Sequence, residues 1–185
     1  MVSTIKLIIF FVGSAGIIYI SLPSLRSYRF HGFYRFFAWE AILALILLNI
    51  NYWFVDPFSV HQIFAWFFLI VSLFLVIHGV QLLRIVGKPD ESREDEGLVG
   101  LEKTTRLVTV GAYKYIRHPL YSSLFFLAWG AFFKMPSWPG GAQTVAATAF
   151  LVVTAKIEEK ENIHFFGSEY EDYIKRTRMF VPYVF

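Results

Sequence analysis

Two polar segments, separated by hydrophobic stretches, carry the side chains that could do chemistry. The first holds His118, at the point where a charged loop meets an apolar run. The second begins with Glu158, where the last apolar run ends. An ionised carboxylate beside hydrocarbon is costly unless it is paired or bound to a cation. We therefore predict one pocket at a membrane surface, surrounded by an imidazole, two phenols and a carboxylate, with His118 and Glu158 as the candidate catalytic residues.

The His118-Pro119 pair marks the start of a helix. Proline is tolerated in the first turn and disfavours helical angles for the residue before it, so His118 is predicted as the N-cap and Pro119 as N1. The unpaired N–H groups and the helix dipole there favour an anionic ligand group such as a carboxylate. The plainer alternative is a capped transmembrane helix with Tyr and Arg anchors at the interface.

The composition is that of a membrane protein. The chain has 185 residues, of which 56% are hydrophobic and 19% aromatic, more apolar surface than a soluble domain of this size can bury. It has no cysteine, which excludes disulfides, thiolate metal sites and a cysteine nucleophile. A net charge of +3, spread over loops, gives no support to nucleic-acid binding. No metal site is predicted either.

The hydrophobic runs predict an all-α integral membrane protein with about five transmembrane helices. A helix needs roughly 20 apolar residues to cross, and tilt accommodates shorter ones. The expected spans are Thr4–Leu22, Phe37–Val55, His61–Leu83, Leu120–Phe133 and Ala142–Thr154, the last two forming a helical hairpin. The first is too long for a signal-peptide core and lacks a cleavage site, so we expect it in the mature protein. An amphipathic helix, Lys156–Arg178, broken near Gly167, follows.

Polar residues inside the spans and between them have distinct expected roles. Glu40, Asn49 and Asn51 should face other helices or water, because lipid does not satisfy them. The long segment Arg84–Arg117 contains an acidic cluster that we interpret as a solvated surface loop. Its second half, Thr104–Ile116, suits packing against a ligand or the membrane face. The acidic cluster comprises Asp90, Glu91, Glu94, Asp95 and Glu96.

The basic residues predict the orientation. Fifteen of the 17 Lys and Arg residues fall in the first loop, the third loop and the tail. The positive-inside rule then places the N-terminus outside, and the C-terminus and the active site in the cytoplasm.

Two motifs in this order resemble a known family. Residues 107–121 read Leu-Val-Thr-Val-Gly-Ala-Tyr-Lys-Tyr-Ile-Arg-His-Pro-Leu-Tyr, and after the hairpin come Glu158-Glu159 and Phe-Gly-x-x-Tyr-x-x-Tyr at 166–173. Together they resemble the isoprenylcysteine carboxyl methyltransferases and the related phospholipid methyltransferases. The resemblance covers about residues 104–183.

The resemblance implies a membrane enzyme that uses S-adenosylmethionine. Residues 104–185 would be the catalytic, cofactor-binding half, and residues 1–103 would supply helices one to three and a variable cytoplasmic loop. His78-Gly79-Val80-Gln81 looks like a further cofactor-side motif. Carried over by position, the cofactor-binding residues would be Leu107, Val108, Tyr113, His118, Pro119, Leu120, Tyr121 and Glu158.

The implied partners are membrane lipids and a lipid-like or prenylated acceptor. The acceptor that the resemblance favours is the carboxylate of a prenylcysteine-type substrate. Thr154 stands where eukaryotic carboxyl methyltransferases of the family have an Arg that is thought to hold that carboxylate, and Ser123 stands where many relatives have Gly. This leaves three alternatives: a lipid amine (phospholipid) N-methyltransferase, an NADPH-dependent sterol-type reductase, some of which share Arg-His-Pro-x-Tyr, and a non-catalytic membrane scaffold.

Overall fold

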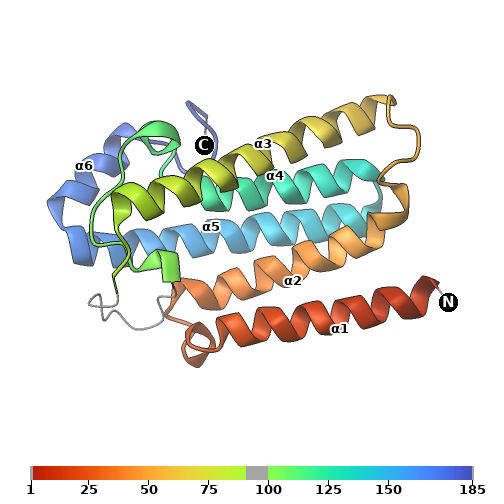
Figure 1. Cartoon of the computed structure of the whole chain (residues 1–185), viewed down its shortest axis with the longest axis horizontal. Coiled ribbons are helices and arrows are strands. Elements are labelled where there is room, and N and C mark those ends of the chain that lie inside the picture. Colours follow the sequence, from red (N-terminus) through yellow and green to blue (C-terminus); the bar gives the residue numbers. More distant parts are fainter. Residues whose placement is uncertain (1, 91–99, 185) are drawn as a thin grey trace.

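The protein is a bundle of long helices that run along a common direction (Figure 1). The computed structural model describes residues 2–90 and 100–184, which leaves Glu91, Glu94, Asp95 and Glu96 of the predicted acidic loop outside the described residues. Isolated bridges are the only β-structure in this part of the chain. The helices are α1 (Val2–Ser21), α2 (His31–Asn49), α3 (Val60–Leu82), α4 (Pro119–Lys134), α5 (Trp138–Phe166) and α6 (Ser168–Arg176).

The predicted all-α membrane fold is confirmed. Four helices of the described chain are long and apolar enough to cross a membrane, over Ser3–Ser21, His31–Tyr52, Val60–Gly87 and Trp138–Phe166. Helices suit this role because lipid offers no partner for backbone N–H and C=O groups, which a helix satisfies internally. With 16 residues, α4 is about 24 Å long and falls short of the roughly 30 Å hydrocarbon core. Five spans therefore stay a prediction.

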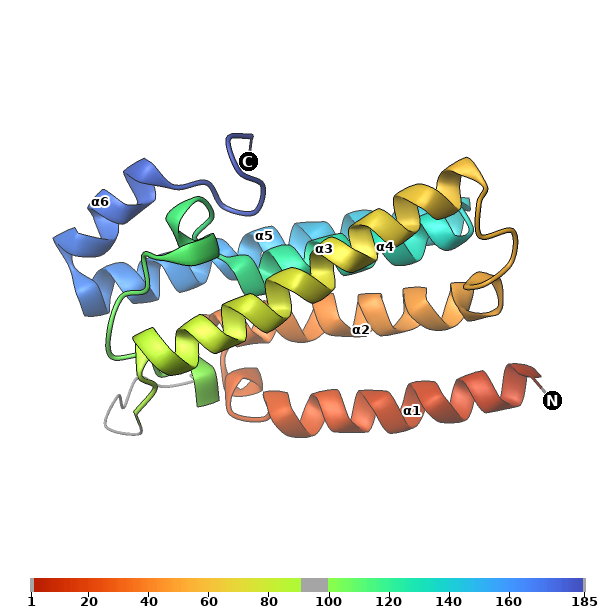
Figure 2. The same cartoon turned by 45° about the horizontal axis from the view of Figure 1, so that its top comes forward.

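The helices pack in pairs. α3 lies along α4, and α2 lies along α5 (Figure 2). Between them, small side chains such as Ala128, Ala131 and Ala147 are fully buried beside Leu45, which lets the backbones approach closely. α1 packs mainly on α2 at the edge of the bundle, and most of its apolar side chains are exposed. That surface is suited to lipid.

Polar groups within the helices behave largely as predicted. The hydroxyl of Ser14 in α1 donates to Glu40 of α2 at 2.7 Å. Asn49 of α2 donates from Nδ2 to the carbonyl of Ala131 in α4 at 2.9 Å. Glu40 and Asn49 thus each form a hydrogen bond to another helix. Asn51 is exposed in the 3-10 turn Ile50–Tyr52 that follows α2, and its contact with other helices or water stays a prediction.

Among the helix boundaries that differ from the prediction, two place residues of the cavity. α2 starts at His31 rather than Phe37, so Arg35 lies within the helix and not in the preceding loop. α5 continues without interruption to Phe166 and takes in the first part of the expected amphipathic helix. Glu and Lys are good helix formers, so the helix does not stop where the apolar run stops. The predicted break at Gly167 is confirmed, because this residue adopts φ +62°, which favours glycine.

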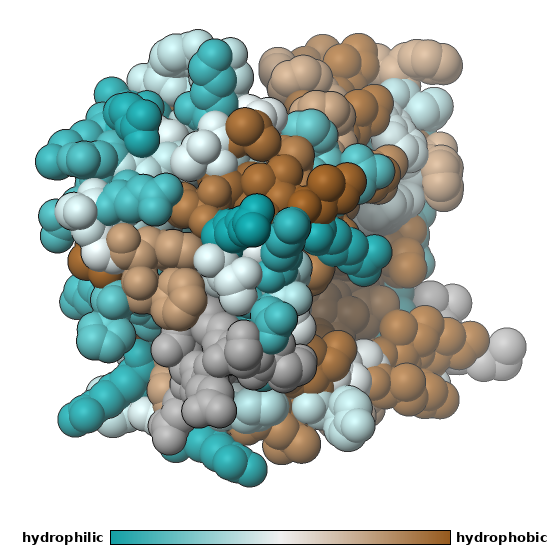
Figure 3. All heavy atoms as spheres, turned by 60° about the vertical axis from the view of Figure 1, so that its left-hand side comes forward, coloured by the Kyte–Doolittle hydropathy of each residue, from teal (hydrophilic) through white to brown (hydrophobic). Residues whose placement is uncertain are grey.

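The polar segments gather at one end of the bundle. The α1–α2 connection, the segment between α3 and α4, and α6 all lie at the left-hand end of Figure 1. Hydrophilic side chains cover much of this end, next to the apolar flank of the helices (Figure 3). The arrangement matches the predicted grouping of two loops and the tail on one side. That this side is cytoplasmic stays a prediction.

A buried lysine connects the helices at the end of the bundle opposite the polar segments. Lys134, fully buried at the end of α4, donates from Nζ to the carbonyl of Trp53 at 3.2 Å and to Oε1 of Gln62 at 3.0 Å. Its ammonium also lies 3.3 Å from the ring centre of Trp66. Gln62 in turn donates from Nε2 to the carbonyls of Tyr52 and Lys134. These hydrogen bonds hold the α2–α3 connection against the end of α4.

Replacing Gln62 with Leu should destabilise the bundle. The substitution removes the only side-chain oxygen that accepts from the buried Lys134 ammonium within the described residues, so we expect a loss of about 1–3 kcal/mol in unfolding free energy. Gln81→Leu, at an exposed position of the same helix, is the matched control. Thermal unfolding in detergent measures both. Equal midpoints for the two variants would contradict the role assigned to Gln62.

Candidate active site

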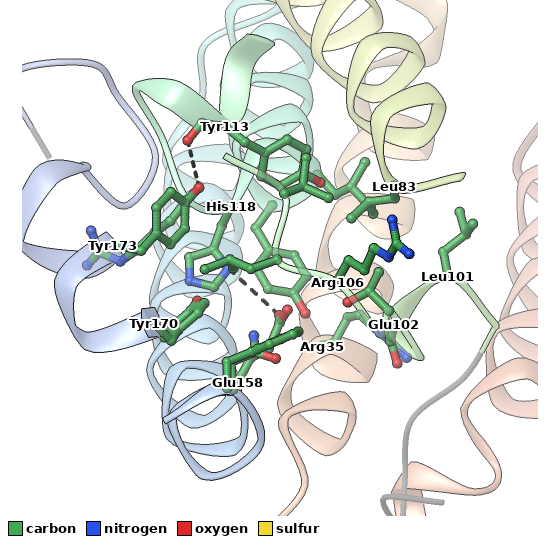
Figure 4. A pocket seen from close by; sticks show the side chains of 18 of the residues that line it. Arg35, Leu83, Leu101, Glu102, Arg106, Tyr113, His118, Glu158, Tyr170 and Tyr173 are labelled. Carbon is green, nitrogen blue, oxygen red and sulfur yellow. Dashed lines mark hydrogen bonds and ion pairs between the residues drawn. The ribbon is translucent and has the colours of Figure 1, made fainter. Parts of the chain in front are cut away.

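A cavity of about 300 Å³ lies at the polar end of the bundle, where five of the helices and the segment before α4 meet (Figure 4). Small-molecule sites are typically clefts of roughly 300–1,000 Å³ with a few polar groups on an apolar lining. The lining comprises Ile20, Arg35, Trp39, Leu83, Leu101, Glu102, Thr104, Arg106, Leu107, Val108, Tyr113, Arg117, His118, Leu120, Tyr121, Leu124, Glu158, Asn162, Phe166, Tyr170 and Tyr173.

His118 occupies the N-cap of α4 with Pro119 following it, as predicted. Its ring is 5% exposed and stacks on Tyr121 one turn later, with ring centres 5.4 Å apart. Nδ1 lies 3.8 Å from Oε2 of Glu158, and Nε2 lies 3.3 Å from Oε1 of Glu159. Both nitrogens thus face carboxylates of α5. The pair predicted from the sequence, His118 and Glu158, shares one cavity.

The C-terminal segment holds the His118 backbone in place. The N–H groups of Arg117 and His118 donate to the carbonyls of Arg178 and Met179, at 2.8 and 3.3 Å. The N–H of Arg178 donates to the carbonyl of Tyr115, which completes a short parallel bridge. The chain after α6 therefore braces the segment before α4.

Arg117 and Tyr173 add two side-chain ties. The Arg117 guanidinium forms an ion pair with Glu159 and donates from Nη1 to the carbonyl of Thr177 at 3.0 Å. The Tyr173 hydroxyl donates to the carbonyl of Tyr113 at 2.7 Å (Figure 4). These contacts join α5, α6 and the segment before α4 into one wall of the cavity.

The His78-Gly79-Val80-Gln81 motif of α3 packs against the segment that carries the cavity residues at 111–120. A Cβ at Gly111, which has φ +60°, would lie 2.5 Å from Nε2 of His78, and a Cβ at Gly79 would lie 3.0 Å from Leu120. Both glycines thus permit close approach of α3 to the segment at 111–120. None of the four motif residues lines the cavity, and Gln81 is exposed.

The structure brings most of the predicted cofactor-binding residues to this cavity. Pro119 is the exception, because it is buried and does not contribute to the lining. Binding itself stays a prediction for all of them. The predicted residues that do line the cavity are Leu107, Val108, Tyr113, His118, Leu120, Tyr121 and Glu158.

Sequence reasoning missed part of the lining. Arg35 and Trp39 come from α2, and Glu102 comes from the 3-10 turn Gly100–Glu102. The cavity therefore draws on both halves of the chain. No local pattern marks these residues. Tyr170 and Tyr173, by contrast, belong to the aromatic motif at 166–173 and could have been assigned from it.

The phenols of the wall are held neutral. Burial raises the pKa of Tyr113 and of Tyr170 well above the ordinary value, and the nearby Glu158 carboxylate raises the pKa of both further. Burial also raises the pKa of Tyr173, although Arg117 partly offsets it. At neutral pH these groups serve as hydrogen-bond donors and polar edges and not as phenolates.

The fold and the cavity together define an all-helical membrane protein with a cavity at one end of its helices. No protein-family profile matches the chain, and no solved structure matches it. Several curated proteins are similar in sequence to the chain. A methanethiol S-methyltransferase of Crocosphaera subtropica is 30% identical over 130 residues, 67% of this chain and 46% of that protein. Methanethiol S-methyltransferase 1 of Bradyrhizobium diazoefficiens is 36% identical over 89 residues, 46% of this chain and 30% of that protein.

A protein-S-isoprenylcysteine O-methyltransferase of Rattus norvegicus is also similar, at 34% identity over 117 residues, 61% of this chain and 40% of that protein. The chain thus spans less than half the length of each of these relatives. They confirm the predicted resemblance to an isoprenylcysteine carboxyl methyltransferase-like family.

Tyr173→Phe tests the protonation of the wall. Because its pKa is raised, Tyr173 should stay protonated at about pH 10, where an unperturbed tyrosine is half ionised. Folded wild type and variant should then show the same phenolate absorbance at that pH, and denatured samples should differ by about half a phenolate, because the released Tyr173 is half ionised there. A folded-state difference as large as the denatured one would contradict the raised pKa.

Proposed function

We propose that this chain is an S-adenosylmethionine-dependent methyltransferase of the membrane, acting on a lipid-like acceptor, with the carboxylate of a prenylcysteine-type substrate as the methylated group. The observation that carries the proposal is the convergence of His118 and Glu158 on one cavity that also contains the residues 107–121 motif. Relatives that carry out methyl transfer, by their names, support the same reaction class.

The cavity lining fits the charges and surfaces of the cofactor. S-adenosylmethionine combines a flat purine, a cationic sulfonium, an ammonium and a carboxylate. Tyr113 and Tyr170 offer aromatic faces, which attract cations and pack against flat rings. Glu158 offers the negative charge, and Arg106 offers a positive one. We propose that these groups, with Leu107, Val108, His118, Leu120 and Tyr121, hold the cofactor.

The contribution of the protein is mainly positioning. The bound cofactor supplies an already activated methyl group. The wall formed by α5, α6 and the segment before α4 holds its side chains in fixed places and excludes water, so donor and acceptor can be aligned in a near-attack geometry. A carboxylate acceptor is already ionised and needs no base. In that case His118 serves to position Glu158 and Glu159, whose oxygens lie 3.8 and 3.3 Å from its ring nitrogens.

A second candidate is methyl transfer to a thiol, favoured by the similarity to methanethiol S-methyltransferases. A thiol must lose its proton before it attacks. His118 lies between two carboxylates, at 3.8 and 3.3 Å, and is placed to accept a proton. The relatives described above support neither the lipid-amine nor the reductase alternative.

Calorimetric titration of the detergent-purified protein with S-adenosylhomocysteine tests the proposal. Wild type should bind saturably. His118→Ala and Glu158→Gln should each bind about tenfold or more weakly, because each removes a polar partner from a mostly buried site. His164→Ala and Glu169→Gln, at exposed positions of α5 and α6, are matched controls and should bind as wild type does. Folded wild type that fails to bind, or that binds NADPH instead, would overturn the methyltransferase proposal.

A further inference from the structure

One buried cation lines the cavity on its α2 side. Arg35, in the first half of α2, is 4% exposed and lines the cavity. Its guanidinium carbon lies 4.7 Å from the ring centre of Trp39, another lining residue. Figure 4 shows Arg35 and Glu102 together at the edge opposite Tyr173. A buried guanidinium is retained at high cost unless it is paired and hydrogen-bonded.

The hydrogen bonding of Arg35 is incomplete. Its guanidinium forms an ion pair with Glu102, which comes from a separate segment of the chain. Its Nε, however, is buried and has no hydrogen-bond partner within the described residues. A guanidinium presents its donors in a planar fork that matches a carboxylate through two parallel bonds. Arg35 thus keeps donor capacity that its ion pair with Glu102 does not use.

Neighbouring charges are already engaged elsewhere. Glu161 of α5 accepts from the backbone N–H of His31 at 3.1 Å and lies 2.5 Å from its Nδ1. Glu158 lies beside His118, with its Oε2 3.8 Å from Nδ1. The carboxylate that occupies Arg35 is therefore Glu102, whose side chain keeps 18% of its surface exposed. It is the less buried partner of the pair, and its Oε2 also lies 3.4 Å from Nε2 of His31, so it keeps a second partner when a ligand replaces it on Arg35.

The surroundings of Arg35 are apolar. Ile20 from the end of α1, Leu83 after α3 and Leu101 beside Glu102 line this side of the cavity. Ile20 is also half exposed on the flank of the bundle, where α1 presents an apolar surface. A ligand that places an anionic group on Arg35 would therefore meet apolar side chains with the rest of its structure.

We propose that Arg35 binds the anionic head group of the acceptor, a carboxylate attached to an apolar chain, and that Glu102 holds the same guanidinium until the acceptor replaces it. The assignment of this ligand as a methyl acceptor rests on the proposed function. The binding site itself rests on the buried guanidinium, its unpaired Nε and the apolar lining. The proposal makes opposite predictions for the two members of one ion pair.

The experiment compares N-acetyl-S-farnesylcysteine with its carboxamide, by saturation binding to the full chain in lipid nanodiscs. Wild type should prefer the acid. Arg35→Met, which keeps the apolar stem, should lose that preference by about tenfold or more, the value of a hydrogen bond to a charged group. Glu102→Gln removes the competing charge and should bind the acid more tightly than wild type does. Arg29→Met, an exposed arginine of the α1–α2 connection, is the control and should keep the wild-type preference.

Several outcomes would overturn the proposal. If the ion pair were only structural, both Arg35→Met and Glu102→Gln would weaken binding of acid and amide alike and lower the unfolding temperature together. Acid preference retained in Arg35→Met, or no binding of either compound to folded wild type, would also exclude the site.

Titration with S-adenosylhomocysteine separates this inference from the proposed function. Loss of its binding in Arg35→Met, with acid preference intact, would assign the arginine to the carboxylate of the cofactor and overturn the acceptor site. An acid preference that depends on Arg35, in a wild type that does not bind S-adenosylhomocysteine, would instead refute the methyltransferase function and leave the anion site standing.

Discussion

The pairing of carboxylates on α5 with groups from distant segments is the constraint on which the site depends. α5 leaves the apolar part of the bundle carrying Glu158, Glu159 and Glu161, and charges there are costly unless they are compensated. Glu158 and Glu159 face His118, and Glu161 faces His31 at the start of α2. Each pair draws a different part of the chain toward the same helix. The cavity is the space that these ties enclose, so the electrostatic requirement of one helix sets the walls of the site.

The two sides of the cavity are built differently. On the His118 side, backbone bonds between 115–118 and 178–179 combine with the bond from Tyr173 to Tyr113, so main chain and side chains reinforce one another. On the other side, a side-chain ion pair joins Arg35 to Glu102, which lies in a short 3-10 turn. The His118 side is held by several hydrogen bonds between different segments, which suits a cofactor that must be bound in a fixed orientation. The other side can exchange one carboxylate for another, which suits a substrate that must enter and leave.

The sequence predicted what local rules and composition control. Apolar runs located the helices, His118-Pro119 located the start of α4, and Gly167 located the break before α6. Helix ends that lie beyond the hydrocarbon are harder to predict, because the apolar runs do not mark them. The start of α2 was missed because Arg35 resembles a loop residue, and the ion pair that compensates its burial comes from Glu102, far away in the sequence. Likewise, most of the cofactor-side lining could be carried over from a contiguous motif, whereas the α2 side is made by contacts between distant segments, which a single sequence does not display.

The two edges of the cavity differ in polarity in the way that the proposed pair of ligands, a charged cofactor and a lipid-like acceptor, requires. Its lining runs from tyrosines and carboxylates beside α6 to Ile20 at the end of α1. The first edge belongs to the end of the bundle that hydrophilic side chains cover, and the proposed charged, water-soluble cofactor could reach it there without crossing hydrocarbon. The second edge adjoins the apolar flank of α1, which packs chiefly on α2 and otherwise faces outward. A lipid-like acceptor can keep its chain in the bilayer and place only its head group inside. Moving the site deeper into the bundle would bury the charges that hold it together, and moving it outward would separate the acceptor from the lipid.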